Sequence, residues 1–533
     1  MDLNNVLGFP ILSLSIFLPM LGALIIWLFV RGDQAVRWAA LAVSVATFIV
    51  TLPLAFMFDE STSHMQFEEL HPWIASFHVN YHLGVDGISM PFIVLTSLLT
   101  IICIISAWEC IQTRVKEYML AFLILETTLI GVFSALDAIL FYFFWEAMLI
   151  PMYLIIGVWG GQNRVYATVK FFLYTLAGSV LMLIALLAMY FKAGHTFSML
   201  AFMDYPFDFT WQLWIWIAFF FAFAVKVPMW PVHTWLPDAH TEAPTAGSVI
   251  LAGILLKMGA YGFLRFSLPM LPDASHYFVP LMVVLSLIAI VYISLVAMMQ
   301  TDMKRLIAYS SIAHMGFVTL GAFMFTGIAL EGALFGMISH GFVAAALFLC
   351  VGVMYDRLHT RDIAAYGGVA NVMPIFGAVI ILFAMANVAL PGASSFVAEI
   401  MVLIGTFDAS TITQAHLPVS VKWVAIVAAS SVVLSACYTL WMCKRVVFGD
   451  VKKESVASMK DMSVREFSFF VPLIVLVAWL GLYPKPVLDV LHKSVTHLVA
   501  QAKTSKLGAA TALAQAAPVL VAVRHERLKE RNN

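Results

Sequence analysis

The sequence predicts an all-α integral membrane protein with about fourteen transmembrane helices. Of its 533 residues, 62% are hydrophobic and only 11% are charged, whereas soluble proteins carry about 25% charged residues. The mean hydropathy is +0.95. Many windows reach or approach the roughly 18 apolar residues that a membrane-spanning helix needs, among them Ile11–Val30, Trp211–Val225, Val279–Met299 and Phe467–Leu482.

Composition also excludes several classes of protein. The first apolar stretch is full length and lacks a basic leader or a small-residue cleavage site, so we expect a first span rather than a signal peptide. The net charge of -1 leaves no basic domain for nucleic acid. The five cysteines form no CxxC pair and lie in apolar runs, which favours inert thiols over iron–sulfur or haem ligands. They are Cys103, Cys110, Cys350, Cys437 and Cys443.

Basic residues are unequally distributed among the loops between the predicted spans. One set of alternate loops is basic, and the other holds almost no lysine or arginine. The longest loop of the second set, around Asp59–His82, is acidic. The positive-inside rule therefore places the basic loops in the cytoplasm and both ends of the core outside. The basic loops contain Arg31, Arg37, Arg114, Lys116, Arg164, Lys304, Arg305, Arg357, Arg361 and the cluster from Lys444 to Arg465.

Two proline-containing segments, Val225–Pro237 and Leu390–Ser395, interrupt otherwise helical runs. A proline removes a backbone donor and clashes with the preceding turn, so each segment predicts a broken helix. Paired broken helices in two halves of a chain are typical of a transporter site. Their separation of about 165 residues fits two repeats of five helices each, roughly residues 117–268 and 278–446.

We divide the chain into a transmembrane domain, residues 1–485, and a C-terminal tail, residues 486–533. Within the tail, Val487–Ala500 has an amphipathic pattern. Ala509–Val523 is apolar but short, and a basic run follows it. This second stretch is either a surface segment or a short fifteenth span with a cytoplasmic end.

Four ionisable residues lie inside apolar runs: Glu146, Lys226, Lys257 and Glu399. An ionisable group at the bilayer centre costs from about 2.5 kcal/mol upward, so each is a functional hypothesis. Burial favours the neutral form of a lysine, while a nearby carboxylate favours the charged form. A Glu–Lys pair can therefore load and release a proton without a metal. The alternative is a set of structural ion pairs, although buried pairs often add no stability over apolar packing.

Two histidines, His314 and His340, lie in successive later spans. A neutral histidine accepts a proton at one nitrogen and releases one from the other, which suits it to a relay. The alternative is that each is an ordinary hydrogen-bonding residue of the interior. Glu109 and Glu126 are further candidates, but either could snorkel to the surface or cap a helix.

Two other polar groups receive structural interpretations. Asp302 with Lys304 and Arg305 is interpreted as a solvated loop cluster. The run His233–Pro244 collects four potential metal ligands, but it lacks the tight spacing that zinc prefers. We interpret this run as a polar turn that caps the next helix, so no metal site is expected.

Four motifs carry a resemblance to a known family: Gly84–Ser89, Trp145-Glu146, Lys226–Pro244 and Lys304–His314. They are similar to the antiporter-like subunits of NADH–quinone oxidoreductase, respiratory complex I, and the similarity extends to about residue 485. In the second broken helix, chains L and N of this family and the related subunits of sodium/proton antiporters usually carry lysine. Glu399 at this position is typical of the chain M type.

The resemblance implies fourteen core helices, two inverted five-helix repeats and proton movement through the subunit. It implies that Glu146 and Lys226 form a switch pair, and that both histidines belong to the polar axis. It also implies that Lys257 is the central relay and Glu399 the terminal exchange group. This would make the chain part of an enzyme, a proton-translocating NADH:quinone oxidoreductase, whose redox site lies on other chains.

The resemblance also implies the surroundings of the chain. FMN, iron–sulfur clusters and quinone are expected on partner subunits, and no cofactor on this chain. The expected partners are other membrane subunits of complex I, especially chains L and N, in a bacterial inner (plasma) membrane. Two alternatives stay open: a sodium/proton antiporter subunit without redox drive, and a scaffold whose buried charges are only structural.

Overall fold

The computed structural model describes residues 8–409 and 411–508. Within them, twelve helices are long and apolar enough to cross a membrane, which confirms the predicted all-α membrane fold. The unbroken ones are α1 (Ile11–Phe29), α2 (Asp33–Phe56), α3 (Met90–Cys110), α4 (Val115–Ser134), α7 (Arg164–Lys192), α9 (Phe209–Lys226), α15 (Val279–Met298), α17 (Gly327–Leu358), α22 (Val421–Val446) and α24 (Val464–Leu482). The other two consist of α5 (Ala138–Ala147) with α6 (Leu149–Trp159), and of the segments between Thr245 and Met270.

Three further apolar helices lie in the same bundle: α16 (Met303–Ala322), α19 (Pro374–Asn387) and α20 (Ser394–Phe407). The last two are shorter than a full span, and they follow each other across one of the predicted breaks. If α16 and the α19–α20 pair also cross the membrane, the total is fourteen. That total, and the two five-helix repeats, stay predictions.

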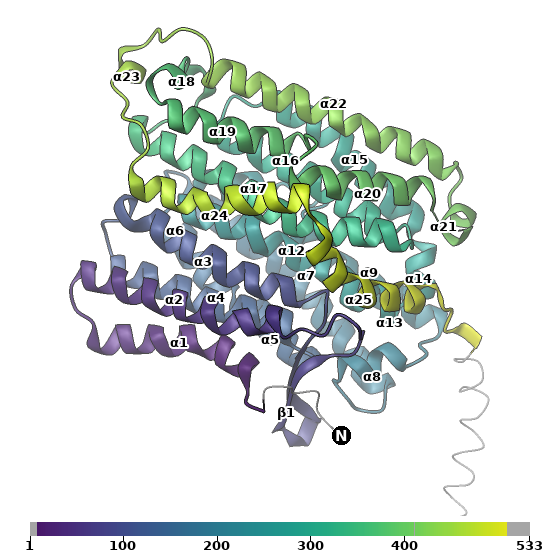
Figure 1. Cartoon of the computed structure of the whole chain (residues 1–533). Helices are drawn as coiled ribbons and strands as arrows, with labels where there is room; N and C mark the ends of the chain where they lie inside the picture. Colours follow the sequence, from purple (N-terminus) through teal and green to yellow (C-terminus); the bar gives the residue numbers. More distant parts are fainter. Residues whose placement is uncertain (1–7, 410, 509–533) are drawn as a thin grey trace, which may run out of the picture.

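The long helices run side by side, so the bundle has two distinct ends (Figure 1). The short helices α18 (Val369–Val372) and α23 (Glu454–Ala457) lie at one end, and α21 (Thr411–His416) lies at the other. Both α18 and α23 belong to loops in the basic set. The positive-inside rule predicts that their end of the bundle faces the cytoplasm.

The opposite end carries a β-hairpin and an amphipathic helix. Strand β1 (Gln66–Ile74) pairs antiparallel with β2 (Val79–Val85) in the long acidic loop. The helix α25 (Lys485–Lys503) packs across α17 and two short helices, α13 (Leu268–Met270) and α14 (Pro272–Tyr277). Its buried face consists of Leu491, Ser494, Val495, Leu498 and Ala502. The tail segment Ala509–Val523, for which a fifteenth span is one alternative, lies outside the described residues.

Both predicted helix breaks are present. The first separates α9 from α10 (Trp235–Glu242) and contains Pro228 and Pro231. There the indole N–H of Trp235 donates to the Val225 carbonyl oxygen at 2.8 Å, so a carbonyl freed by the break has a partner away from water. The second break separates α19 from α20 and contains Pro391.

The interpretation of His233–Pro244 as a turn is wrong, because most of this run is the helix α10. Its two carboxylates have separate partners within the protein. Asp238 pairs with Lys170 at 2.7 Å and with Arg305 at 2.8 Å. The Glu242 carboxylate accepts from the Asn163 backbone N–H at 2.8 Å. Among the described residues, no group of three or more His, Cys, Asp or Glu side chains is placed to hold a metal.

The helix between Thr245 and Met270 is irregular, which the sequence does not predict. It consists of α11 (Thr245–Ile250), a π-helical segment at Leu251–Leu255, α12 (Leu256–Gly262), a second π-helical segment at Phe263–Ser267, and α13. This helix is buried along its whole length. Such π-helical insertions occur mostly as single turns at functional sites.

A buried ion pair joins this helix to α3. The Arg265 guanidinium donates to both carboxylate oxygens of Asp86, at 2.9 and 2.6 Å. The same carboxylate accepts from the backbone N–H groups of Ile88 and Ser89 at the start of α3. Arg265 also donates to the Tyr261 hydroxyl at 3.1 Å. Two helices far apart in sequence are thus fixed by one bidentate contact.

We expect Arg265→Met to lower the free energy of unfolding by about 3–5 kcal/mol, because it leaves the Asp86 carboxylate buried and unpaired. Asp86→Asn combined with Arg265→Met removes that charge and keeps an N-terminal cap, so the double variant should be more stable than Arg265→Met alone. Thermal unfolding of the purified full chain in detergent measures both. A double variant less stable than the single one would contradict this account.

Candidate functional site

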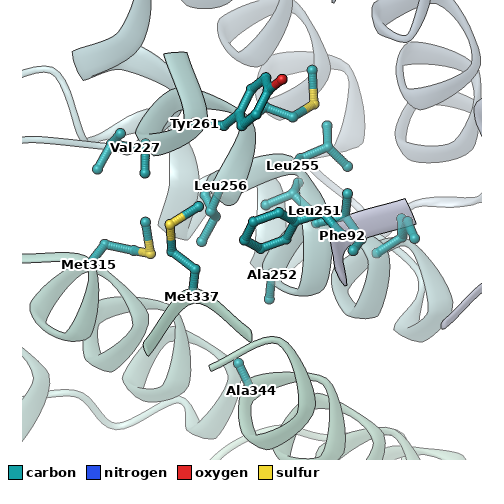
Figure 2. Packing of buried hydrophobic residues seen from close by; sticks show 14 of the residues in the cluster. Phe92, Val227, Leu251, Ala252, Leu255, Leu256, Tyr261, Met315, Met337 and Ala344 are labelled. Carbon is teal, nitrogen blue, oxygen red and sulfur yellow. The ribbon is translucent and has the colours of Figure 1, made fainter. Parts of the chain in front are cut away.

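The six predicted site residues lie on different helices of the bundle interior. Four of them are buried and two are partly buried. Apolar side chains surround the centre of the group. Figure 2 shows Leu255 and Leu256 packed near Phe92, Met315 and Met337. The six are Glu146 on α5, Lys226 at the end of α9, Lys257 on α12, His314 on α16, His340 on α17 and Glu399 on α20.

Glu146 and Lys226 are neighbours without a direct ion pair. The carboxylate of Glu146 interacts with Ser179 of α7 and with Lys226, but the pair is not within the 4.0 Å of a salt bridge in the described structure. Instead, Lys226 Nζ lies 3.7 Å from Met148 Sδ and 5.3 Å from the centre of the Trp145 ring. The lysine amine thus lies against a thioether and an aromatic ring. It is also close enough to the Glu146 carboxylate to interact with it electrostatically.

Lys257 is fully buried, with no solvent-accessible side-chain surface. Its Nζ donates to the Ala252 carbonyl oxygen, which belongs to the first π-helical segment. Its Nζ also lies 2.7 Å from His340 Nδ1. A buried amine needs such partners, because an unpaired polar group in an apolar interior is costly. The π-helical segment is therefore part of the lysine site.

The line continues from His340 to Glu399. The ring centres of His340 and His314 are 5.9 Å apart, and His314 Nδ1 lies 3.1 Å from Glu399 Oε1. These three side chains line a cavity of ≈ 30 Å³. A water molecule needs roughly 10–15 Å³ of such space. Four residues on four helices therefore form one polar line, Lys257–His340–His314–Glu399.

Serine hydroxyls fix the second break against this line. Ser339, adjacent to His340 in sequence, lies 2.7 Å from Ser394 Oγ and 3.1 Å from Ser395 Oγ. Both serines stand at the start of α20, one helical turn before Glu399. The contacts therefore hold the acid-bearing helix beside the histidine-bearing helix.

Glycines allow the helices to approach closely enough for these contacts. A Cβ on Gly259 would lie 2.8 Å from Lys226 Cβ and 2.7 Å from the Phe223 oxygen. A Cβ on Gly341 would lie 2.8 Å from Leu95 Cδ2 and 3.2 Å from the Gly253 oxygen. The helices of Lys226 and Lys257, and those of Lys257 and His340, thus pack through glycine.

The two further candidates, Glu109 and Glu126, lie in different surroundings. Glu126 is buried on α4, and both of its carboxylate oxygens are without a hydrogen-bond partner. It therefore neither snorkels nor caps a helix. Glu109 is exposed and pairs with Arg465 at 2.8 Å, so it lies off the polar line.

The interpretation of Lys304 as part of a solvated loop cluster is wrong. Lys304 is buried, and its Nζ donates to the Ala243 carbonyl oxygen at 2.5 Å. The junction of α10 and α11 covers it, which depends on the broken helix and is not evident from the local sequence. Only its neighbours behave as expected, because Asp302 pairs with Arg361 at 3.3 Å and Arg305 is partly exposed.

The sequence analysis missed the importance of His240. Both ring nitrogens are buried without a hydrogen-bond partner, and the ring stacks on Phe348 with centres 4.3 Å apart. His240 lies within electrostatic range of both Lys304 and Lys257. The only sequence signal was its position in the first break, where it was weighed as a metal ligand.

Two cavities lie on the predicted cytoplasmic side of His240. The inner cavity has a volume of ≈ 140 Å³ and is lined by Glu242, Lys304 and Arg361. The outer one has a volume of ≈ 850 Å³ and shares Trp159 and Tyr355 with the first. Together they bring a charged, solvent-facing surface close to the buried histidine.

Comparisons with known proteins agree with this architecture. The sequence profile of the family described as NADH:quinone oxidoreductase/Mrp antiporter, TM, matches residues 135–440. The chain is 52% identical over 506 residues to NADH-quinone oxidoreductase subunit M of Rhodobacter capsulatus, covering 92% of this chain and 96% of that one. It is 46% identical over 494 residues to NADH-ubiquinone oxidoreductase chain 4 of Marchantia polymorpha, covering 92% and 97%.

Solved structures share the fold. A chain of respiratory complex I from Thermus thermophilus with bound NADH superposes with a TM-score of 0.83 at 28% identity, covering 92% of this chain and 100% of that chain. A chain of the Mrp complex from a Dietzia species superposes with a TM-score of 0.80 at 19% identity, covering 93% and 99%. The chain belongs to the NADH:quinone oxidoreductase/Mrp antiporter family. Its predicted resemblance to the complex I subunits, and to the chain M type among them, is confirmed.

We expect Gly259→Ala to destabilise the chain by about 1–3 kcal/mol, because the added methyl group overpacks the contact between α12 and α9. Gly327→Ala is the matched control, since a Cβ at Gly327 meets nothing within 4 Å. Thermal unfolding of the purified full chain compares the two. Equal stability of both variants would show that the close approach at Lys226 is not needed.

Proposed function

We propose that this chain is a proton-translocating membrane subunit of NADH–quinone oxidoreductase, driven by redox chemistry on other subunits. The observation that carries the proposal is the continuous line from Lys257 to Glu399 inside an otherwise apolar bundle. Ionisable groups are costly in such surroundings, and these groups contact one another in a row. A row of proton donors and acceptors suits proton transfer better than the binding of a larger substrate.

Proton movement along the line follows from the contacts. A proton on Lys257 Nζ passes to His340 Nδ1, 2.7 Å away. Release from the other ring nitrogen carries it toward His314, across the gap that the small cavity borders. His314 Nδ1 then transfers it to Glu399 Oε1 at 3.1 Å. After these steps both histidines have the proton count with which they began, Lys257 has lost one proton and Glu399 has gained one. The cycle closes when Lys257 takes up a new proton and Glu399 releases its own.

In this proposal, protons reach Lys257 from the two cavities on the predicted cytoplasmic side. Lys304 lines the inner cavity, and His240 is within electrostatic range of both Lys304 and Lys257. In this proposal a proton from the cytoplasm reaches Lys257 through groups of the first broken helix. We therefore add His240 to the six candidate residues, as part of the uptake path.

Glu146 and Lys226 act as the switch. A carboxylate close to Lys226 stabilises the ammonium form, while withdrawal or protonation of the carboxylate favours the neutral amine. The absence of a direct ion pair between these two described side chains leaves the carboxylate free to move without breaking a salt bridge. Lys226 and Lys257 lie on helices in contact at Gly259, and in this proposal the switch acts on Lys257 through that helix contact.

The names of the relatives support the proposal that this chain is part of a larger complex. They are named as subunits of NADH-quinone or NADH-ubiquinone oxidoreductase, so the partners of this chain are other membrane subunits of that complex, with chains L and N as its neighbours. FMN, iron–sulfur clusters and quinone belong to partner subunits in this proposal. The bilayer is the inner membrane of a bacterium.

Lys226→Ala and, separately, Glu399→Gln test the proposal in vesicles that contain the assembled complex. Each variant removes a titrating group, and loss of a positioned proton-transfer group slows its step by about 100-fold or more. We expect fewer protons taken up per NADH oxidised, measured with a pH-sensitive dye. Lys493→Ala, on the exposed face of α25, is the control and should pump normally. Unchanged pumping in both test variants would favour the scaffold alternative.

Glu146→Asp tests the switch, because it keeps the charge and shortens its reach. A small misplacement of a reacting group slows transfer by about tenfold to a hundredfold. We expect NADH-driven proton uptake to fall by that order. The free energy of unfolding should change by less than about 1 kcal/mol, so the amount of assembled complex should stay normal. Native gel electrophoresis measures assembly. Collapse of the assembled complex, with normal uptake in what remains, would assign Glu146 a structural role.

A further inference from the structure

An apolar groove lies on the outside of the bundle, between the second half of α22 and the residues at and just after the end of α15. The two helices pack side by side (Figure 1), and the groove between them has a volume of ≈ 1010 Å³. Its floor and walls consist of exposed or partly exposed side chains, so it opens to the membrane. The apolar residues that line it are Met298, Met299, Val432, Val433, Ala436, Cys437, Leu440 and Trp441.

Two basic residues close one end of the groove. Lys444 and Arg445 line it at the last turn of α22. Neither takes part in an ion pair among the residues that the structure describes, and the Lys444 ammonium lies 5.9 Å from the centre of the Trp441 ring. This end belongs to the predicted cytoplasmic side, where Trp and basic residues lie at the depth of lipid headgroups.

The length of the groove matches one leaflet of a bilayer. Its lining on α22 extends from Val432 to Arg445, which at 1.5 Å per residue is about 20 Å along the helix axis. One leaflet contributes about 15 Å of hydrocarbon, and the headgroup region adds the remainder. The first half of α22, from Val421 to Ser431, contributes nothing to the groove.

We propose that this groove binds an anionic phospholipid of the cytoplasmic leaflet, with an acyl chain along α22 and the phosphate at Lys444 and Arg445. Basic pockets between transmembrane helices on the cytoplasmic side bind anionic headgroups in this way. The flexible side chains of Met298 and Met299 adapt to an acyl chain of variable shape. A transmembrane helix of a partner subunit fits the charged end of the groove less well, because it would need an acidic residue opposite two cations.

Fluorescence quenching of Trp441 tests the proposal directly. The full chain is reconstituted in phosphatidylcholine vesicles that contain equal fractions of either brominated phosphatidylglycerol or brominated phosphatidylcholine. The signal of Trp441 is the difference between the parent chain and Trp441→Phe. Each basic side chain near the membrane surface strengthens anion attraction by a factor of about five, so brominated phosphatidylglycerol should occupy the groove at least about fivefold more strongly.

Three variants determine the cause of any preference. Lys444→Gln with Arg445→Gln should bring the two lipids to equal quenching. Arg31→Gln with Lys452→Gln removes the same charge from exposed loops on the same side and should leave the preference unchanged. Ala436→Phe fills the groove and should reduce quenching by both lipids.

Four results would overturn the proposal. The first is equal quenching by both lipids in the parent chain. The second is a preference that survives the loss of Lys444 and Arg445 charge, and the third is undiminished quenching in Ala436→Phe. The fourth is quenching of Trp441 in the reconstituted chain that disappears in the assembled complex, because a neighbouring subunit would then cover the groove.

Discussion

Lys257 is the point on which the site depends, because its amine is fully buried and must be hydrogen-bonded within the protein. The Ala252 carbonyl oxygen and His340 Nδ1 supply its partners. The first partner requires the π-helical segment, and the second requires α17 to pass close to the irregular helix. The approach at Gly253 and Gly341 makes that possible. One buried amine thus determines a local helix geometry and a helix–helix contact.

The helix breaks extend the same constraint to the switch lysine, Lys226, and to the far end of the line, Glu399. Lys226 is the last residue of α9, where the carbonyl end of a helix favours a cation. Glu399 lies shortly after the start of α20, which the serine contacts hold against α17. In both cases the break provides a helix terminus inside the apolar bundle. An ionisable side chain near such a terminus has polar backbone groups that an unbroken helix would not offer.

Polarity in this molecule is concentrated along the line and at its cytoplasmic approach. Lys304 lines the inner charged cavity and His240 is within electrostatic range of both Lys304 and Lys257, while Glu126 stays isolated in α4. The outer surface is apolar, and the groove at α22 is one place where basic residues meet it. The same physical rule covers all three cases: in a medium without water, each charge needs a partner from the protein, from the lipid headgroups or from the solvated end of the bundle.

The sequence by itself determined the membrane fold and both helix breaks, and it singled out six candidate site residues, because a charge or a proline within an apolar run is visible without any tertiary contact. It also determined the family, since Lys226–Pro244 is long and specific. Only the tertiary structure decided which charges touch. Spacing along the chain placed His340 between Lys257 and Glu399, but the order of contact through His314 depends on how α16, α17 and α20 pack. The burial of Lys304, the isolation of His240 and the π-helical turns likewise depend on side chains far away in sequence, and local pattern carries no information about them.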